Sequence, residues 1–251
     1  MPVDCFCHAC SPHPAQACVR AADSRAARGS CCSDGRVARR WQVDPDRPDR
    51  AAIRAAGELL SRGGVIIYPT ETYYGLGVRP ELPAAVERVF QIKGRAFSKP
   101  IPLIASDLEV VLRIVATWPP MAAKLAKAFW PGPLTFVLVA APFLLPQLHA
   151  HTGKIGIRIS SHPVARALAE AGGGLLTATS ANESGRPPCR ALSEMPEALP
   201  AKVDVLLDAG TLGTGAADLP STIVDLTSAV PRLVRPGCIP WEIVEGVLRG
   251  E

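Results

Sequence analysis

The sequence predicts an α/β fold, with a twisted, mixed and largely open sheet flanked by helices. Two observations favour this class. Short apolar runs rich in β-branched residues alternate along the chain with segments whose apolar residues recur at helical spacing. The 251 residues can bury a sizeable core, and they contain no internal repeat. We therefore expect one main folded domain.

Residues 1–43 differ in composition from the rest of the chain. They combine Cys, Ala, Arg, Ser and Pro with almost no aliphatic residues, so this extension is predicted to be disordered. Cys5, Cys7, His8 and Cys10 are residue types that bind soft metals, but their spacing matches no common zinc pattern and we assign no metal site. Deleting the extension is expected to leave the activity intact.

The remaining composition indicates the compartment and excludes a membrane role. After the extension only Cys189 and Cys238 remain, so a reducing cytoplasm is the simpler expectation. No apolar stretch approaches the roughly 20 residues that a membrane span needs. The net charge of +4 is spread along the chain, which is compatible with an anionic ligand or with RNA.

The folded domain is expected to span residues 50–245, with a tail at 246–251. Helical spacing and stop signals predict helices at 50–62, 84–92, 108–116, 121–129 and 163–171. Apolar or alternating runs predict strands at 65–68, 101–105, 135–140, 154–159, 175–179, 203–207, 222–226 and 232–234. A proline-glycine corner at 130–133 joins the fourth helix to the third strand.

A polar loop follows the first buried strand. Thr70, Thr72, Tyr73 and Tyr74 offer hydroxyl groups, and the glycines that end the loop allow close approach of a ligand to the backbone. Such loops at the strand ends of open α/β sheets are where ligands usually bind. The alternative is a tight strand-to-helix turn with incidental hydroxyls.

Cations are grouped at two other places. Lys93-Gly94-Arg95, with Lys99 nearby, ends a helix and would suit a phosphate, although cations there are most often a solvated helix end. Lys154 and Arg158 are four residues apart on one strand, so they share a face and favour an anion. Replacing Arg158 should affect ligand use more than folding, because one partly exposed cation contributes little stability.

Small hydroxyl residues at 177–186 end an apolar strand, a second polar segment lies at 220–225, and Arg235-Pro236-Gly237 closes the domain. Their hydrogen-bonding groups must be satisfied by local turns or by a ligand. The chain has no phosphate-binding loop of the Walker type, no dinucleotide fingerprint and no nucleophile elbow. A site of cations, hydroxyls and amides works by positioning an anionic substrate and stabilising charge on a phosphoryl group.

The ordered motifs PTETYYGLG, KGR, WPGPLT, GIRI followed by HP, TSAN followed by SG, PSTIVD and RPG resemble those of the YrdC/Sua5 family. The resemblance covers residues 50–245 and is to the short, single-domain form. It implies a threonylcarbamoyl-AMP synthase, which makes threonylcarbamoyl-adenylate and pyrophosphate from L-threonine, bicarbonate and ATP. The product serves the threonylcarbamoyl modification of adenosine 37 in tRNA.

The resemblance also implies cofactors, partners and site residues. Mg²⁺ would accompany ATP, and no organic cofactor would be tightly bound. The partners would be the proteins that transfer the threonylcarbamoyl group to tRNA, and the enzyme could also contact tRNA itself. Threonine would contact Thr70, Thr72, Arg158, Ser180 and Ser221. ATP would contact Lys93, Arg95, Lys99, Lys154, Asn182, Arg190 and Arg235. No residue is assigned as acid, base, nucleophile or metal ligand.

Some residues depart from the family pattern, and two other functions remain open. Many members have Asn at Lys99, His at Ser106 and a Ser-Pro-Thr run at Pro188-Cys189-Arg190. One alternative function is a non-catalytic RNA-binding module, including one for double-stranded RNA, although an RNA groove favours aromatic platforms and more cations over the uncharged hydroxyls found here. The other is a relative that transfers a carbamoyl group through carbamoyl-adenylate.

Overall fold

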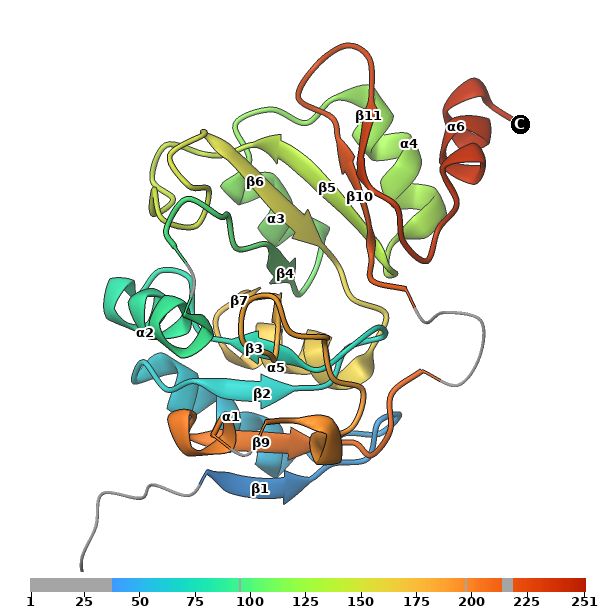
Figure 1. The fold of residues 1–251 in the computed structure, drawn as a ribbon. Helices are drawn as coiled ribbons and strands as arrows, with labels where there is room; N and C mark the ends of the chain where they lie inside the picture. Colours follow the sequence, from blue (N-terminus) through green and yellow to red (C-terminus); the bar gives the residue numbers. More distant parts are fainter. Residues whose placement is uncertain (1–37, 95, 197, 214–218) are drawn as a thin grey trace, which may run out of the picture. The chain divides into compact units, whose positions relative to one another are not determined.

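Helices and strands alternate along the chain in the computed structural model of the protein, as the sequence predicts (Figure 1). The structure describes residues 38–94, 96–196, 198–213 and 219–251. These residues belong to one compact unit. The α/β class is confirmed, but the strands form two mixed sheets where one was expected.

Sheet A has five strands, and two helices cover one of its faces. Its strand order is β1 (Arg39–Gln42), β9 (Val205–Asp208), β2 (Ile66–Tyr68), β3 (Gly75–Gly77) and β8 (Thr179–Ser180). The first three pair in parallel, and β2–β3 and β3–β8 are antiparallel. Apolar residues of α1 (Arg50–Ser61) and α5 (Pro163–Ala171) pack on β2 and β9 in a shared core.

Sheet B has six strands. Their order is β11 (Arg232–Arg235), β10 (Thr222–Asp225), β5 (Leu134–Val139), β6 (Lys154–Arg158), β4 (Leu103–Ala105) and β7 (Leu175–Thr177). The other helices are α2 (Pro83–Lys93), α3 (Leu108–Ile114), α4 (Pro120–Phe129) and α6 (Trp241–Arg249), with short 3₁₀ turns at Leu192–Glu194 and Pro200–Lys202. Helices α4 and α6 lie side by side beside β10 and β11 (Figure 1).

The predicted strand at 175–179 passes from one sheet to the other. Its first part is β7 in sheet B, and its last residue begins β8 in sheet A. Between them the Ala178 amide donates to Pro102 O at 2.7 Å, while the Thr177 amide donates to Val78 O at 3.0 Å. The hydroxyl-rich run therefore starts where the two sheets meet.

The glycines after the first polar loop have a packing role. The loop is a connection between antiparallel β2 and β3, so the alternative of a strand-to-helix turn is wrong. Tyr68 is fully buried and donates to Thr177 O at 2.8 Å. A Cβ on Gly77 would lie 2.7 Å from the Tyr68 ring, and one on Gly75 would lie 3.0 Å from it. These glycines make room for Tyr68, which the expectation of close ligand approach did not consider.

The boundaries at both ends of the predicted domain need correction. Strand β1 lies within the segment 1–43 that was predicted to be disordered, and it pairs with β9. At the other end α6 runs across the predicted boundary at 245 and includes most of the expected tail. Residues 1–37, with the cysteines considered for metal binding, lie outside the described residues. Within the described part of the chain, no helix is long and apolar enough to cross a membrane.

Candidate functional site

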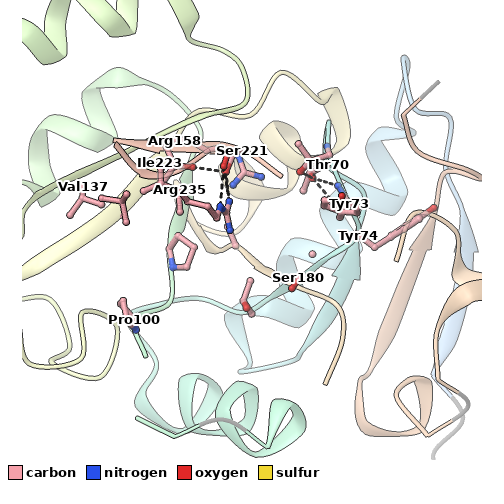
Figure 2. Close-up of a pocket in the computed structure, with 18 of the residues that line it drawn as sticks. Thr70, Tyr73, Tyr74, Pro100, Val137, Arg158, Ser180, Ser221, Ile223 and Arg235 are labelled. Atoms are coloured by element: carbon pink, nitrogen blue, oxygen red, sulfur yellow. Dashed lines mark hydrogen bonds between the residues drawn. The ribbon is translucent and has the colours of Figure 1, made fainter. Parts of the chain in front are cut away.

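A cavity of about 340 Å³ is lined by residues of both sheets and of the loops at their edges (Figure 2). Seven of the predicted site residues line it, namely Thr70, Thr72, Lys154, Arg158, Ser180, Ser221 and Arg235. All five residues predicted to contact threonine are in this set. Figure 2 shows Thr70 and Tyr73 on one side of the cavity and Arg158, Ser221 and Arg235 on the other. Residues far apart in the sequence are thus brought together.

The polar loop before β3 is shaped by its own first threonine. The Thr70 hydroxyl accepts hydrogen bonds from the amides of Thr72 and Tyr73, both at 3.2 Å, and donates to Tyr73 O at 2.6 Å. This is the local turn chemistry typical of Ser and Thr. Because the Thr70 hydroxyl is engaged in the turn, Thr72, whose hydroxyl lies 3.2 Å from it, is better placed to serve a ligand.

Arg158 is buried and paired, which corrects the expectation that it is partly exposed. Only 5% of the residue is accessible, and its Nε donates to Glu71 Oε1 at 2.9 Å. Removing one partner of a buried ion pair leaves the other charge uncompensated and costs roughly 3–5 kcal/mol. Stability and ligand use will therefore both change when Arg158 is replaced.

Glu71 was missed as a site residue by the sequence analysis. Its second carboxylate oxygen accepts a hydrogen bond from the hydroxyl of Ser160, which is fully buried. The signal was a lone carboxylate within an otherwise uncharged hydroxyl loop. That signal identifies no partner, because Arg158 is 87 positions away.

Ser221 and Arg235 form another wall of the cavity. The Ser221 hydroxyl lies 2.9 Å from that of Thr135, a further residue that the sequence analysis missed, and Arg235 donates to Ser221 O at 2.7 Å. A Cβ on Gly237 would lie 2.2 Å from Pro220 O, so only glycine lets these segments approach. Arg158 and Arg235 both line the cavity. Desolvation lowers the pKa of Arg235, and the nearby charge of Arg158 lowers it further.

Asp225 holds Lys154, the first residue of β6, through its carboxylate. Lys154 Nζ donates to Thr227 Oγ1 at 2.7 Å and to Asp225 Oδ2 at 3.3 Å, and Arg232 donates to the same Asp225 oxygen at 3.2 Å. Burial alone would raise the pKa of Asp225, but hydrogen bonds from Thr227, Arg232 and Lys154 outweigh burial and lower the pKa to about 2. Asp225 is thus a fixed negative charge that orients Lys154.

Lys93 and Asn182 lie behind the cavity wall and do not line it. Lys93 is 3% exposed, and its Nζ donates to the backbone oxygen and to the side-chain oxygen of Asn182, both at 2.8 Å, and to Ser180 O. The Ser180 hydroxyl donates to Asn182 Oδ1 at 2.7 Å. In this arrangement the two residues shape the loop that carries Ser180.

Two other predicted ATP contacts, Lys99 and Arg190, are not among the residues that line the cavity. Arg95 lies outside the described residues, and Lys99 is exposed. The Arg190 guanidinium lies 5.3 Å from the ring centroid of Tyr73, which itself lines the cavity. Ser106, one of the departures from the family pattern, donates to its neighbour Asp107.

The fold and the cavity define a class of protein. Two arginines, a lysine and several hydroxyls surround a space that fits a small anionic molecule, and charge-assisted hydrogen bonds from arginine suit carboxylates and phosphates. Among the described residues no group of three or more His, Cys, Asp or Glu is arranged to hold a metal ion. This is an α/β protein with a cavity whose cations and hydroxyls suit a small anionic molecule.

The chain belongs to the Sua5/YciO/YrdC family. The family model, described as "Telomere recombination", matches residues 58–237. A threonylcarbamoyl-AMP synthase of Pyrococcus abyssi is 33% identical over 203 residues, covering 81% of this chain and 59% of the relative. A putative threonylcarbamoyl-AMP synthase of Mycobacterium tuberculosis H37Rv is 36% identical over 206 residues, covering 82% and 93%.

The fold is also that of a solved structure of this family. The crystal structure of P. abyssi Sua5 complexed with L-threonine has a TM-score of 0.77 and 32% identity to this chain. The match covers 83% of this chain and 60% of that protein. This chain therefore spans less than two thirds of the length of the P. abyssi protein and nearly the whole length of the mycobacterial relative.

Proposed function

We propose that the protein is a threonylcarbamoyl-AMP synthase that uses L-threonine, bicarbonate and ATP. The observation that carries the proposal is the convergence of Thr70, Thr72, Arg158, Ser180 and Ser221 on one cavity. It is supported by the names of the relatives and by the L-threonine in the P. abyssi Sua5 complex. A cavity of about 340 Å³ lies within the range of small-molecule sites and has room for an amino acid.

In the proposed mechanism the enzyme orients its substrates and forms no covalent intermediate. Arg158 binds the threonine carboxylate, and hydroxyls of the cavity hold the rest of the amino acid. The threonine amine attacks the carbon of bicarbonate, with loss of water, to give a carbamate. A carbamate oxygen then attacks the α-phosphorus of ATP, the bond to the β-phosphate oxygen breaks, and pyrophosphate leaves. Fixed cations are expected to stabilise the charge that develops on the phosphates.

The ATP phosphates are proposed to lie against Lys154 and Arg235, because these cations line the cavity beside the threonine residues. Lys93 and Asn182 would act by shaping the Ser180 loop. Mg²⁺ is proposed to enter with ATP, since Mg²⁺ is usually bound through phosphate oxygens and water with few protein ligands.

The cellular setting follows from the same proposal. The adenylate would pass to proteins that place the threonylcarbamoyl group on tRNA, and these steps belong in the cytoplasm. The RNA-binding alternative is not favoured, because the site is a cavity lined by uncharged hydroxyls and a few cations. Single-stranded RNA grooves use aromatic platforms and rows of cations, and modules for double-stranded RNA contact phosphates and 2′-hydroxyls over an extended surface.

The test is pyrophosphate release by the purified protein from ATP and Mg²⁺, with L-threonine and bicarbonate each present or omitted. The proposal expects release only when both are present. Release with carbamoyl phosphate in place of threonine and bicarbonate would instead support carbamoyl transfer. No release under any condition would contradict an adenylate-forming activity.

A further inference from the structure

An ion pair connects the two sheets beside the cavity. Glu71 lies in the loop between β2 and β3 of sheet A, and Arg158 ends β6 of sheet B. The two side chains are 11% and 7% exposed, and Arg158 Nε lies 2.9 Å from Glu71 Oε1. The pair therefore crosses between the sheets in a largely buried environment, where water screens the interaction little.

The two partners differ in their access to the cavity. Arg158 lines the cavity, and Glu71 does not. One oxygen of Glu71 accepts from Arg158 and the other accepts from Ser160, whose Oγ also accepts the His162 amide at 3.2 Å. Glu71 thus has a protein partner on each oxygen, and because it does not line the cavity it can act on a ligand there only through those partners.

We propose that Glu71 is a positioning residue that fixes Arg158 for the carboxylate of the amino-acid substrate. This inference rests on the proposed function. Glu71 accepts from Arg158 Nε, so the two terminal nitrogens of the guanidinium can donate to a ligand. These nitrogens are donors used in bidentate recognition of a carboxylate. Arginine has a long side chain with considerable rotamer entropy, so fixing it before the substrate arrives lowers the cost of binding.

The same contact sets the position of the hydroxyl loop. Glu71 stands between Thr70 and Thr72, which both line the cavity. Tying Glu71 to β6 therefore holds these hydroxyls at a fixed separation from Arg158. The cavity is accordingly preformed in its amino-acid part, while the cations Lys154 and Arg235 are held by other partners.

The experiment compares Glu71→Ala with Glu71→Gln by calorimetric titration of L-threonine and by the KM for ATP in the pyrophosphate assay. Glu71→Ala frees Arg158 and is expected to weaken threonine binding about tenfold, within the range of coupling between contacting residues. Glu71→Gln keeps an oxygen that accepts from Arg158 Nε and should stay within about threefold of the wild type. The KM for ATP should not change in either variant.

The control is Glu81→Ala, which removes an exposed carboxylate paired with Arg79 on the surface. It should leave both threonine and ATP use unchanged. If Glu71→Ala does not fold, Ser160→Ala takes its place, since it removes the hydrogen bond to the second Glu71 oxygen, and about threefold weaker threonine binding is expected.

Three results would overturn the inference. Unchanged threonine affinity in Glu71→Ala, or in Ser160→Ala where that variant replaces it, would leave the ion pair a purely structural link. Equal losses for threonine and ATP would indicate general distortion of the site. A wild-type protein that binds no threonine would contradict the proposed function, and this inference would fail with it, whereas failure in the variants alone leaves the function standing.

Discussion

Asp225 illustrates how single buried charges organise this protein at the scale of the residue. The residue is 5% exposed, and its carboxylate is held by Thr227, Lys154 and Arg232. Burial alone would raise the pKa, yet these partners lower it from the usual 3.8 of an aspartate to about 2. A depressed folded-state pKa means that the unfolded chain binds the proton more readily, so the ionised carboxylate stabilises the fold at neutral pH.

We expect Asp225→Asn to lower the free energy of unfolding at pH 7 by about 2 kcal/mol, from the difference of nearly two pKa units. The contribution is present above the unfolded pKa near 3.8 and is lost as the pH falls through about 2. Urea denaturation from pH 7 to pH 2 should therefore show the two proteins converging in acid. The surface variant Asp46→Asn should stay within about 0.5 kcal/mol of the wild type at pH 7. A loss for Asp225→Asn that is constant over this range would contradict the assignment.

At the scale of the element, strand β1 holds another buried carboxylate, that of Asp208, in place. Arg40 of β1 donates two hydrogen bonds to Asp208 Oδ2, at 2.8 Å from Nε and at 2.6 Å from Nη2, and Gln42 of β1 donates to the same oxygen. Asp208 is 3% exposed, and Tyr74, which lines the cavity, donates to Gly210 O at 2.7 Å just beyond it. A strand within the supposedly dispensable extension therefore supports a carboxylate close to the site.

Two truncations test this role of β1. A chain that begins at Ala38 keeps the strand, and one that begins at Asp44 lacks it. The shorter chain should be less stable than the longer one by at least about 1 kcal/mol, because Asp208 loses hydrogen bonds in a buried position. Chemical denaturation of the two proteins measures the difference. Equal stability would restore the original expectation that residues 1–43 are dispensable.

The hairpin β2–β3 yields a prediction about packing. Gly77→Ala would place a Cβ 2.7 Å from the Tyr68 ring and 3.0 Å from Leu176 Cδ1, so we expect a loss of about 1–3 kcal/mol from overpacking. Gly246→Ala in α6 is the matched control, because its Cβ would meet its nearest atom at 3.5 Å and alanine favours helices by about 0.5–1 kcal/mol. Thermal denaturation should therefore move in opposite directions for the two variants. A neutral Gly77→Ala would show that Tyr68 can shift.

At the scale of the whole molecule, the cavity makes stability depend on ligand. Its walls come from both sheets, so a ligand that fills it binds only the folded chain. L-threonine at about 100 times its Kd should stabilise the protein by about 2.7 kcal/mol, which corresponds to roughly 5–10 °C in Tm. Differential scanning calorimetry with L-threonine, and with L-valine as an isosteric control without the hydroxyl, measures the effect. Equal shifts for the two amino acids would contradict recognition of the threonine hydroxyl by the cavity.

The sequence by itself determined the α/β class, the order of most elements and the stretches that carry the site. These features are local, because hydrophobic periodicity, glycine and proline positions and clustered hydroxyls act over a few residues. The runs that contain Thr70, Arg158, Ser180 and Ser221 were found in this way, and the structure brings them to one cavity.

Only the tertiary structure decided how the strands divide into two sheets and which charges pair. Arg158 and Glu71 are 87 positions apart, and Arg40 and Asp208 are 168 apart. Local patterns contain no information on such pairs, because they depend on which strands become neighbours when the core is buried. The same reason explains why Lys93 could be recognised as a cation of the family motif but not as a buried support of the Ser180 loop.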